Sequence, residues 1–304
     1  MHAQIQEYGY TLILDEVIEV IEPIPVSAAD QKMLTETGKI SVDEDGRVRW
    51  KDLLYKGRFE PLKRMANSKT LFCMEGRAYL WRMPVDMLRA FEEAYVLTFL
   101  FEGSHMKHYL DIHGIPYDLW HVEDAELTPG RQDLAKEKKK IRGLLEVYDG
   151  RLNALGEKPS ALSKSWWQTN SRTGKIKVLE ANTYNFLRYE CKAESANSMW
   201  SVFSDMRRKC TPNGYAKGFC ACNARATNEF RERENLAYLV NVYEHPYVVK
   251  WFSQHGVTVD QEAFALSQLL QWIWRSAIRD DKPVKLYLPS KRMRTILRDW
   301  LEEK

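Results

Sequence analysis

Thr11-Leu12-Ile13-Leu14-Asp15-Glu16-Val17 is the stretch from which the fold class is inferred. Four residues suited to a buried strand run directly into two adjacent carboxylates. A continuous apolar run of this kind is typical of a central strand in a parallel sheet that is covered on both faces. Ligands of open α/β sheets gather at the carboxyl ends of the strands, where Asp15 and Glu16 would lie. The stretch therefore predicts an α/β fold with an acidic site at one edge of its sheet.

Two adjacent carboxylates at such an edge suit nucleotide hydrolysis. One of them would hold Mg²⁺ near the β- and γ-phosphates, and the next would orient the attacking water. The alternative is that Asp15 and Glu16 belong to a solvated helix start, since short motifs often occur by chance. Both interpretations stay open on this stretch alone.

Composition limits the class of protein. The chain has 304 residues, enough for two domains of ordinary size. Its net charge of +3 is small, so any nucleic-acid argument depends on local basic clusters. No apolar run approaches the roughly 18 residues of a membrane span, and Met1-His2-Ala3-Gln4 has none of the features of a signal peptide. Five cysteines, an odd number, favour reduced thiols, so we expect a cytoplasmic protein without membrane contact.

The first half contains a second strand of the same type. Residues 94–100 are mainly apolar and carry a hydroxyl at Thr98. If this strand and the Asp-Glu strand share one half-sheet, Thr98 would sense the γ-phosphate, although an ordinary β-branched strand residue is the alternative. Residues 26–70 between the two strands are polar and mixed, and they are expected to form an insertion with a hairpin around Asp45-Gly46. A strand is also expected over 78–83, with helices over 84–92 and 106–113.

The composition changes over residues 127–145, where a Thr-Pro-Gly turn is followed by many charged residues. A lysine-rich helix is expected to begin the second half there. We therefore expect two domains, 1–130 and 131–304. Strand-like stretches in the second half are 175–179, 218–222 and 285–288, and helical patterns occupy 193–209, 234–243, 261–279 and 291–303. Alternation of this kind predicts βαβ units and a mostly parallel sheet.

A repeated spacing marks the segment near residue 275. Gln271, Arg275 and Arg279 recur every fourth residue, so a helix would present them on one face. Arginines there could reach phosphates across a cleft, because the guanidinium keeps its charge and offers a fixed fork of donors. The alternative is an amphipathic surface helix that buries Trp272 or Trp274.

Two further clusters could contact phosphates. Over residues 218–228 a short strand is expected to feed a loop of small and hydrogen-bonding residues, of a kind that holds phosphates. Thr227 or Asn228 could equally be a helix N-cap. Lys291, Arg292 and Arg294 form a basic segment near the end of the sequence, and a solvated helix face is its alternative.

Two groups of histidine and cysteine residues are candidate metal ligands. His105 and His108 would share a helical face, and Cys220 and Cys222 the same side of a strand. Neither group completes a four-ligand set, so a structural metal is not expected, and buried thiols are.

The order of these segments resembles motifs II to VI of superfamily 2 helicases, the DEAD/DEAH-type nucleic-acid-dependent ATPases, and specifically a phage or mobile-element member. The segments are Asp15-Glu16, Leu97-Thr98, 161–166, 223–228 and 271–279. The resemblance implies two RecA-like lobes, the first incomplete, with ATP and Mg²⁺ as cofactors and single-stranded or duplex DNA as partner. It implies catalytic roles for Asp15 (with Mg²⁺), Glu16, Arg275 and Arg279, ATP binding or coupling by Thr98 and Gln271, and nucleic-acid contacts by Arg225, Thr227, Asn228, Lys291, Arg292 and Arg294.

Two departures from the helicase pattern bear on activity. Arg275 and Arg279 are four residues apart, where the family usually has three, and no segment matches the phosphate loop G-x-x-x-x-G-K-[ST]. The resemblance therefore implies that an upstream region or a partner chain carries this Walker A loop, and that the chain alone has weak or absent ATPase activity. Two alternatives remain: a terminase large-subunit ATPase, and a non-catalytic nucleic-acid-binding or scaffold protein on a decayed motor fold.

Overall fold

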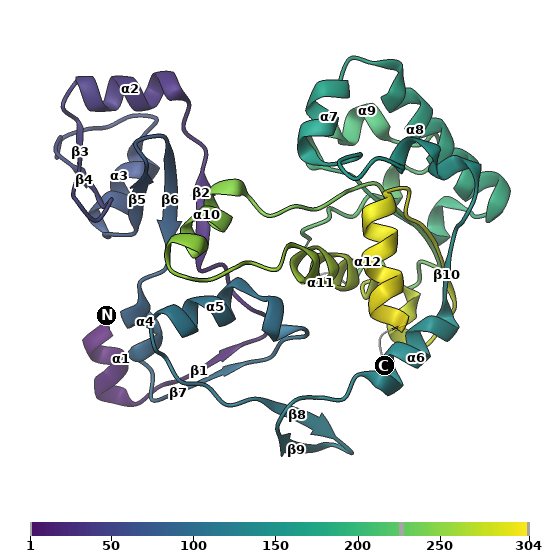
Figure 1. The fold of residues 1–304 in the computed structure, drawn as a ribbon, viewed down its shortest axis with the longest axis horizontal. Coiled ribbons are helices and arrows are strands. Elements are labelled where there is room, and N and C mark those ends of the chain that lie inside the picture. Colours follow the sequence, from purple (N-terminus) through teal and green to yellow (C-terminus); the bar gives the residue numbers. More distant parts are fainter. Residues whose placement is uncertain (1, 225–227, 303–304) are drawn as a thin grey trace. The chain divides into compact units, whose positions relative to one another are not determined.

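The computed structural model describes residues 2–224 and 228–302. The chain folds into two compact units (Figure 1). Unit 1 comprises Met1–Tyr117 and Glu244–Asp260, and unit 2 comprises Asp118–Tyr243 and Gln261–Lys304. The sequence predicted a single boundary near residue 130, whereas the chain leaves unit 1 after Tyr117 and later returns to it for residues 244–260. None of the helices within the described ranges has both the length and the apolar composition of a membrane span.

One part of unit 1 is built on a small antiparallel sheet in the order β2-β6-β5. Its helices and strands are β2 (Ile21–Ile24), α2 (Ala28–Glu36), β3 (Ile40–Val42), β4 (Val48–Trp50), α3 (Glu60–Asn67), β5 (Leu71–Met74) and β6 (Ala78–Arg82). The predicted hairpin at Asp45-Gly46 is confirmed, since β3 pairs with β4 across it and Gly46 takes a φ of +81°. A φ in this range favours glycine. Leu34, Trp50 and Leu71 belong to the core of this part.

The rest of unit 1 surrounds a two-stranded parallel sheet of β1 (Thr11–Leu14) and β7 (Glu93–Val96). Its helices are α1 (His2–Tyr8), α4 (Val85–Arg89), η1 (Phe101–Gly103), α5 (His105–Ile112) and α10 (Pro246–Gln254). The prediction that β1 is a buried central strand is wrong, because β1 has a single partner strand and the side chain of Ile13 is 67% exposed. The expectation of a mostly parallel sheet also fails for unit 1, whose largest sheet is antiparallel.

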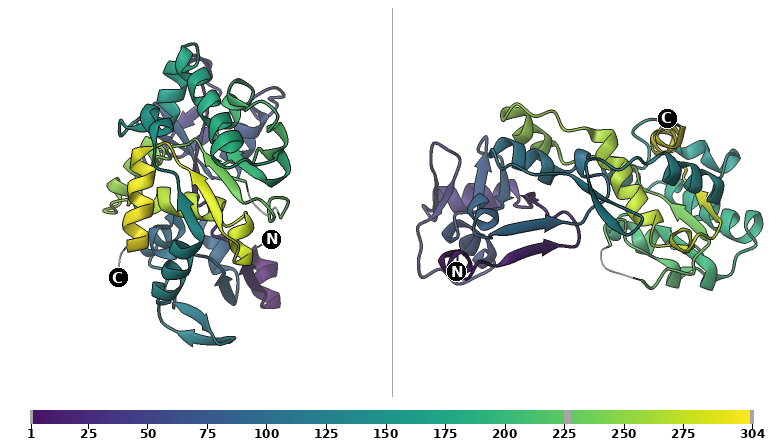
Figure 2. Two further views of the ribbon diagram at one scale, coloured as in Figure 1. Left: turned by 90° about the vertical axis from the view of Figure 1, so that its right-hand side faces the viewer. Right: turned by 90° about the horizontal axis from the view of Figure 1, so that it is seen from below.

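Unit 2 contains a four-stranded, entirely parallel sheet in the order β10-β13-β12-β11 (Figure 2). The strands are β10 (Leu145–Val147), β11 (Ser198–Ser201), β12 (Asn235–Tyr238) and β13 (Val284–Tyr287). On one face Trp200 and Tyr287 belong to a cluster with Trp167 and Leu179. On the other face the ring of Tyr238 lies 4.9 Å from that of Trp272. The predicted α/β class, with a parallel sheet covered on both faces, is confirmed in this unit.

The remaining elements of unit 2 are helices and one hairpin. They are β8 (Trp120–Glu123), β9 (Glu126–Pro129), α6 (Ala135–Leu144), η2 (Arg151–Gly156), α7 (Lys164–Asn170), α8 (Gly174–Asn185), η3 (Phe186–Glu190), η4 (Ser195–Asn197), η5 (Ser204–Met206), α9 (Arg207–Cys210), η6 (Ala216–Gly218), α11 (Gln261–Ile273), η7 (Ala277–Asp280) and α12 (Lys291–Glu302).

Several local predictions for unit 2 are wrong. Residues 175–179 lie in α8, residues 193–209 contain β11, and residues 234–243 contain β12. A short apolar run that is buried on both sides of a sheet loses its alternation, so its period cannot separate strand from helix. The predicted strand at 285–288 and helix at 291–303 are confirmed with small shifts at their ends.

Candidate functional site

The structure brings the acidic pair of unit 1 beside the segment that carries Thr98. Leu14 is the register partner of Val96, and the backbone N–H of Leu97 donates to the carbonyl of Leu14 at 2.8 Å. Asp15 and Glu16 therefore leave β1 at the edge where Leu97 and Thr98 leave β7. The sequence suggested that these residues share one half-sheet, and the parallel pairing of β1 and β7 agrees.

The side chains at this edge offer carboxylate and hydroxyl oxygens as ligands. Asp15 is exposed, whereas Glu16 and Thr98 are half-buried. Carboxylate oxygens of this kind suit Mg²⁺, which usually keeps several waters and takes one or two protein carboxylates. Among the residues that the structure describes, no group of three or more His, Cys, Asp or Glu side chains could hold a metal ion. Any Mg²⁺ here would depend on Asp15 and Glu16 with water or phosphate oxygens.

In unit 2 the two predicted phosphate-contacting segments meet at the amino ends of β12 and β13. The guanidinium of Arg279 donates to the side-chain oxygen of Asn228 at 2.7 Å. Arg231 donates through two nitrogens to both carboxylate oxygens of Asp280, each at 2.5 Å. Hydrogen bonding to Arg231 also lowers the pKa of the Asp280 carboxyl. Residues about 50 positions apart in sequence thus form one polar surface.

The backbone supports the same association. The N–H of Ala277 donates to the carbonyl of Arg233 at 3.0 Å, and that of Lys285 to the carbonyl of Glu234 at 2.8 Å. These bonds tie η7 and the start of β13 to the segment that leads into β12. Arg225 and Thr227 lie outside the described residues, so only Asn228 of that predicted set is placed.

The predicted arginine-bearing helix face is not observed. α11 ends at Ile273, Arg275 lies in the following turn and Arg279 lies in η7. The break occurs at Ser276, whose hydroxyl donates to the carbonyl of Ile273 at 2.6 Å and caps η7. Gln271, which is half-buried in α11, does not share one continuous helix with the two arginines. Trp272 is buried, as the alternative interpretation expected, and its indole N–H donates to the carbonyl of Cys220 at 3.2 Å.

The basic segment at 291–294 is engaged with loops at the carboxyl edge of the sheet. Arg294 is buried and donates to the carbonyls of Leu288 at 2.9 Å and Pro289 at 2.6 Å, and to the carboxylate of Glu157 at 2.7 Å. Arg292 donates to the carbonyl of Val242 at 2.7 Å and lies over an aromatic ring. Lys291 is exposed, with its amine 3.6 Å from Glu157. Both arginines therefore position protein loops, which leaves Lys291 as the more accessible cation.

Asn241 is the residue at this edge that the sequence analysis missed. It is buried, its amide donates to the carbonyls of Pro159 at 2.7 Å and Ala161 at 2.8 Å, and its oxygen accepts from Arg292 at 3.1 Å. These bonds hold the 161–166 segment, where Leu162 has a φ of +64°. An asparagine directly after the apolar run 236–240 was the available signal. Asn241 thus fixes the segment 161–166 against the carboxyl edge of the sheet.

Comparison with known proteins identifies the family. Residues 139–301 match the model described as the YonV C-terminal Rossmann-like domain, and residues 21–81 match the YonV middle domain. The SPbeta prophage-derived uncharacterized protein YonV of Bacillus subtilis (strain 168) is 37% identical over 306 residues, which cover 97% of this chain and 74% of that protein. The chain belongs to the YonV family. No solved structure matches it.

The family assignment agrees with the fold of each matched region. The YonV C-terminal match lies in unit 2, apart from the residues that return to unit 1, and contains the parallel sheet. The middle-domain match covers the antiparallel part of unit 1, and it includes the whole of the expected insertion at 26–70. The relative's prophage origin fits the phage-type resemblance, but neither description names a helicase.

Buried polar groups of the YonV-type sheet lie near its carboxyl edge. Ser201 and Tyr238 are register partners on β11 and β12, and neither hydroxyl has a hydrogen-bond partner among the described residues. Burial raises the pKa of Tyr238 and raises that of Cys220 to about 11. These groups therefore stay protonated at neutral pH, and Cys220 is not an activated nucleophile. All five cysteines are free thiols, as expected.

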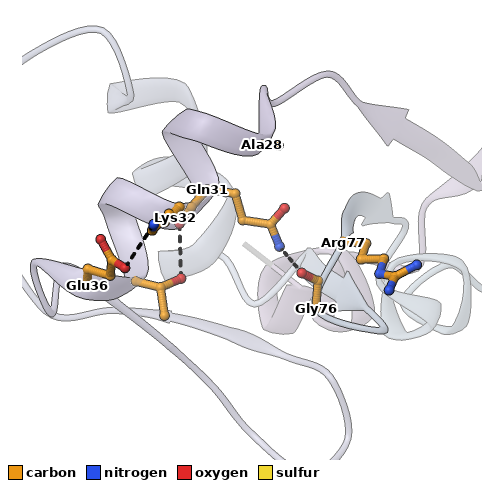
Figure 3. Close-up of a pocket in the computed structure, with 7 residues that line it drawn as sticks. Ala28, Gln31, Lys32, Glu36, Gly76 and Arg77 are labelled. Atoms are coloured by element: carbon orange, nitrogen blue, oxygen red, sulfur yellow. Dashed lines mark hydrogen bonds and ion pairs between the residues drawn. The ribbon is translucent and has the colours of Figure 1, made fainter.

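A separate hollow of about 590 Å³ lies beside α2 in the YonV middle domain (Figure 3). The amide of Gln31 donates to the carbonyl of Gly76 at 2.5 Å, and Lys32 lies 3.7 Å from Glu36. Its other lining residues are Ala28, Thr35 and Arg77. No site residue predicted from the sequence lines this hollow.

Proposed function

We propose that this YonV-family chain is part of a nucleic-acid-dependent ATPase of helicase type that acts on DNA in the cytoplasm. In this proposal unit 2 is the second motor lobe, and unit 1 includes part of the first. The observation that supports it best is the bond between Arg279 and Asn228, together with the neighbouring Arg231–Asp280 pair. These contacts join two segments that resemble helicase motifs V and VI.

The proposed roles follow the chemistry of each group. Asp15 would bind Mg²⁺ and Glu16 would orient the attacking water, with Thr98 next to them as the coupling residue. Arg275 and Arg279 would bind the γ-phosphate, because a guanidinium offers several donors in a fixed plane, with Gln271 alongside. Asn228 and Lys291 would contact the DNA backbone, with Arg225 and Thr227. Arg292 and Arg294 would contribute by holding the adjacent loops.

ATP with Mg²⁺ fits the residues only in part. Two carboxylates next to a hydroxyl are suitable magnesium and water ligands. The sequence has no G-x-x-x-x-G-K-[ST] loop to hold the β- and γ-phosphates. We therefore expect slow turnover by the chain alone.

The same missing loop favours one competing function, a DNA-binding scaffold without catalysis. The engagement of Arg292 and Arg294 with protein carbonyls also agrees with a scaffold. The two functions differ in whether DNA binding is linked to phosphate release.

Phosphate release from ATP, measured with and without single-stranded DNA, tests the proposal. We expect slow hydrolysis that DNA stimulates and that Glu16→Gln or Arg275→Ala reduces to background. Glu22→Gln and Arg208→Ala are the matched controls and should leave the rate unchanged, since both side chains are exposed and lie outside the proposed site. DNA binding without any ATP turnover would overturn the motor in favour of the scaffold, and metal-dependent cutting of DNA would favour a terminase.

A further inference from the structure

Two arginines flank one aromatic ring on a single face of the antiparallel sheet in unit 1. Arg47, just before β4, forms a β-bridge with Phe72 of β5, and its guanidinium carbon lies 5.8 Å from the centre of the Phe72 ring. Phe72 is the register partner of Leu80 on β6, so Arg82, two residues further along β6, projects from the same face. The guanidinium carbon of Arg82 lies 3.9 Å from the centre of the same ring. Two positive charges therefore lie beside one ring.

These guanidiniums have few partners of their own. Arg82 is half-buried, its Nε is buried without a hydrogen-bond partner, and its side chain makes no ion pair with any residue that the structure describes. The Nε of Arg47 is also buried without a partner, and the acid nearest to Arg47 is Asp45, whose carboxylate oxygen lies 3.6 Å from Nη2. Contact with aromatic rings offsets part of the cost of taking a cation out of water. A paired anion would offset more of it.

A buried guanidinium in unit 2 provides a comparison. Arg294 donates to two backbone carbonyls and to the carboxylate of Glu157. Arg82 instead faces aromatic rings, with the ring centre of Trp251 5.0 Å from its guanidinium carbon. A guanidinium that stacks on a ring keeps its in-plane N–H donors available for an oxyanion. The surroundings of Arg82 therefore suit an anion that comes from outside the chain.

The electrostatic surroundings of the pair are positive. Burial lowers the pKa of Arg82, and Arg47 adds to the shift while Tyr109 and Asp45 oppose it. Burial lowers the pKa of His113 as well, and Arg82 is among the basic side chains that lower it further. Both arginines keep their charge at neutral pH. An anion between the two guanidiniums would reduce the repulsion that they and their neighbours experience.

We propose that Arg47 and Arg82 form a phosphate-binding site on this face of the sheet, with Phe72 holding both guanidiniums in place. A phosphate group suits two guanidiniums better than a carboxylate does, because it offers more acceptor oxygens and can carry more charge. The phosphate could come from a small phosphorylated molecule or from a DNA backbone, which present the same oxygens. The site shares no residue with the proposed motor site and does not rest on the proposed function.

Binding of inorganic pyrophosphate to the full chain, measured by isothermal titration calorimetry, tests this site. Arg82→Gln and Arg47→Gln should each weaken binding at least about tenfold, because each removes charge-assisted hydrogen bonds. Arg64→Gln is the matched control. It removes the same charge from an exposed position of α3, whose buried residues join the core on the opposite face of the sheet, and it should leave binding unchanged.

The source of the phosphate is separated by competition. Displacement of bound pyrophosphate from the chain by a single-stranded oligonucleotide, with Arg82 required for binding of both, would identify a DNA backbone as the ligand. Pyrophosphate that the oligonucleotide does not displace would identify a small phosphorylated molecule. Both results support a phosphate site.

Thermal unfolding distinguishes a binding role of Arg82 from a structural one. Because Arg82 has no hydrogen-bonded partner to lose, Arg82→Gln should change the melting temperature of the free chain by no more than about 3 °C. Pyrophosphate should raise the melting temperature of the wild-type chain and not that of the variant, because a ligand that binds the folded state stabilises it. Should Arg82→Gln fail to fold, Arg47→Gln decides the question, since the Arg47 side chain is 32% exposed.

Three results would overturn the inference: no binding of pyrophosphate by the wild-type chain, binding that Arg47→Gln and Arg82→Gln both retain, or a large loss of stability in Arg82→Gln with binding intact. Binding is measured without turnover, so it is separate from the proposed function. Pyrophosphate binding through Arg82 in a chain that does not hydrolyse ATP would keep this site and reject the ATPase. ATP hydrolysis by a chain whose pyrophosphate binding does not need Arg82 would do the reverse.

Discussion

The strands β1 and β12 are both short, mainly apolar runs in parallel sheets, yet they have different environments. Leu236, Ala237 and Tyr238 of β12 are buried, whereas no residue of β1 is. β12 lies between two parallel neighbours, and β1 has one. An apolar run therefore indicates that a segment can form a buried strand. Whether its side chains are buried depends on the neighbouring strands and helices.

The largest effect is expected in the sheet of unit 2. Trp200 is fully buried on β11, and its indole N–H donates to the carbonyl of Tyr215 at 2.8 Å. Trp200→Ala should lower the free energy of unfolding by about 3–5 kcal/mol, because it leaves a large cavity and an unpaired carbonyl. Trp120→Ala on the exposed hairpin is the control and should cost less than about 1 kcal/mol. Urea unfolding followed by circular dichroism measures both, and equal costs would contradict the burial of β11.

The next effect concerns the buried guanidinium at the carboxyl edge. Arg294→Ala should cost about 2–3 kcal/mol, because it leaves the carbonyls of Leu288 and Pro289 without their donor. Glu157→Ala should cost less than about 1 kcal/mol, since Glu157 is about half exposed and solvent screens its ion pair. If the two variants lose equal stability in urea, the ion pair rather than the carbonyl bonds holds this edge.

A smaller, pH-dependent effect is expected in unit 1. Burial lowers the pKa of His108, with Lys107 and His105 adding to the shift while Asp111 and Asp260 oppose it. Because the folded pKa lies below the unfolded value of about 6.5, the unfolded chain binds protons first as the pH falls. Stability should therefore be complete above about pH 6.5 and decline below it.

His113 should act in the same direction. Burial lowers its pKa too, and Arg82, Arg89 and His255 add to the shift. Hydrogen exchange in α5 at pH 7.5 and 5.5 measures the effect on unit 1 separately from unit 2. His108→Gln should reduce the difference between the two pH values, and an unchanged difference would assign it to other groups.

How far the sequence predicted the molecule depends on how local each determinant is. The Asp45-Gly46 hairpin and α12 were predicted correctly, because turn chemistry and a strong amphipathic pattern are local. β12 was mistaken for a helix because its burial on both faces comes from neighbours distant in sequence. Residues 175–179 alternate like a strand, yet Ile176, Leu179 and Thr183 of α8 lie on one buried helix face. The spacing of buried residues over the whole of α8, rather than over five residues, shows that this segment is a helix.

The candidate site shows the same limit. The sequence identified Asn228 and Arg279 as members of two separate polar segments, but it could not show that their side chains meet. It placed Arg275 and Arg279 on one helix because a period of four is helical, whereas the local hydrogen bonds of Ser276 end that helix. Asn241 escaped notice because its role depends on carbonyls about 80 residues earlier.

The smallest effect returns to β1. Ile13→Thr should change the stability of the chain by no more than about 0.5 kcal/mol, because the side chain is already largely in water and threonine keeps the β-branched shape that suits a strand. Thermal unfolding of the chain measures the change in stability. A loss of more than about 1 kcal/mol in the free chain would mean that Ile13 is already packed, and that β1 resembles β12 more closely than its exposure indicates.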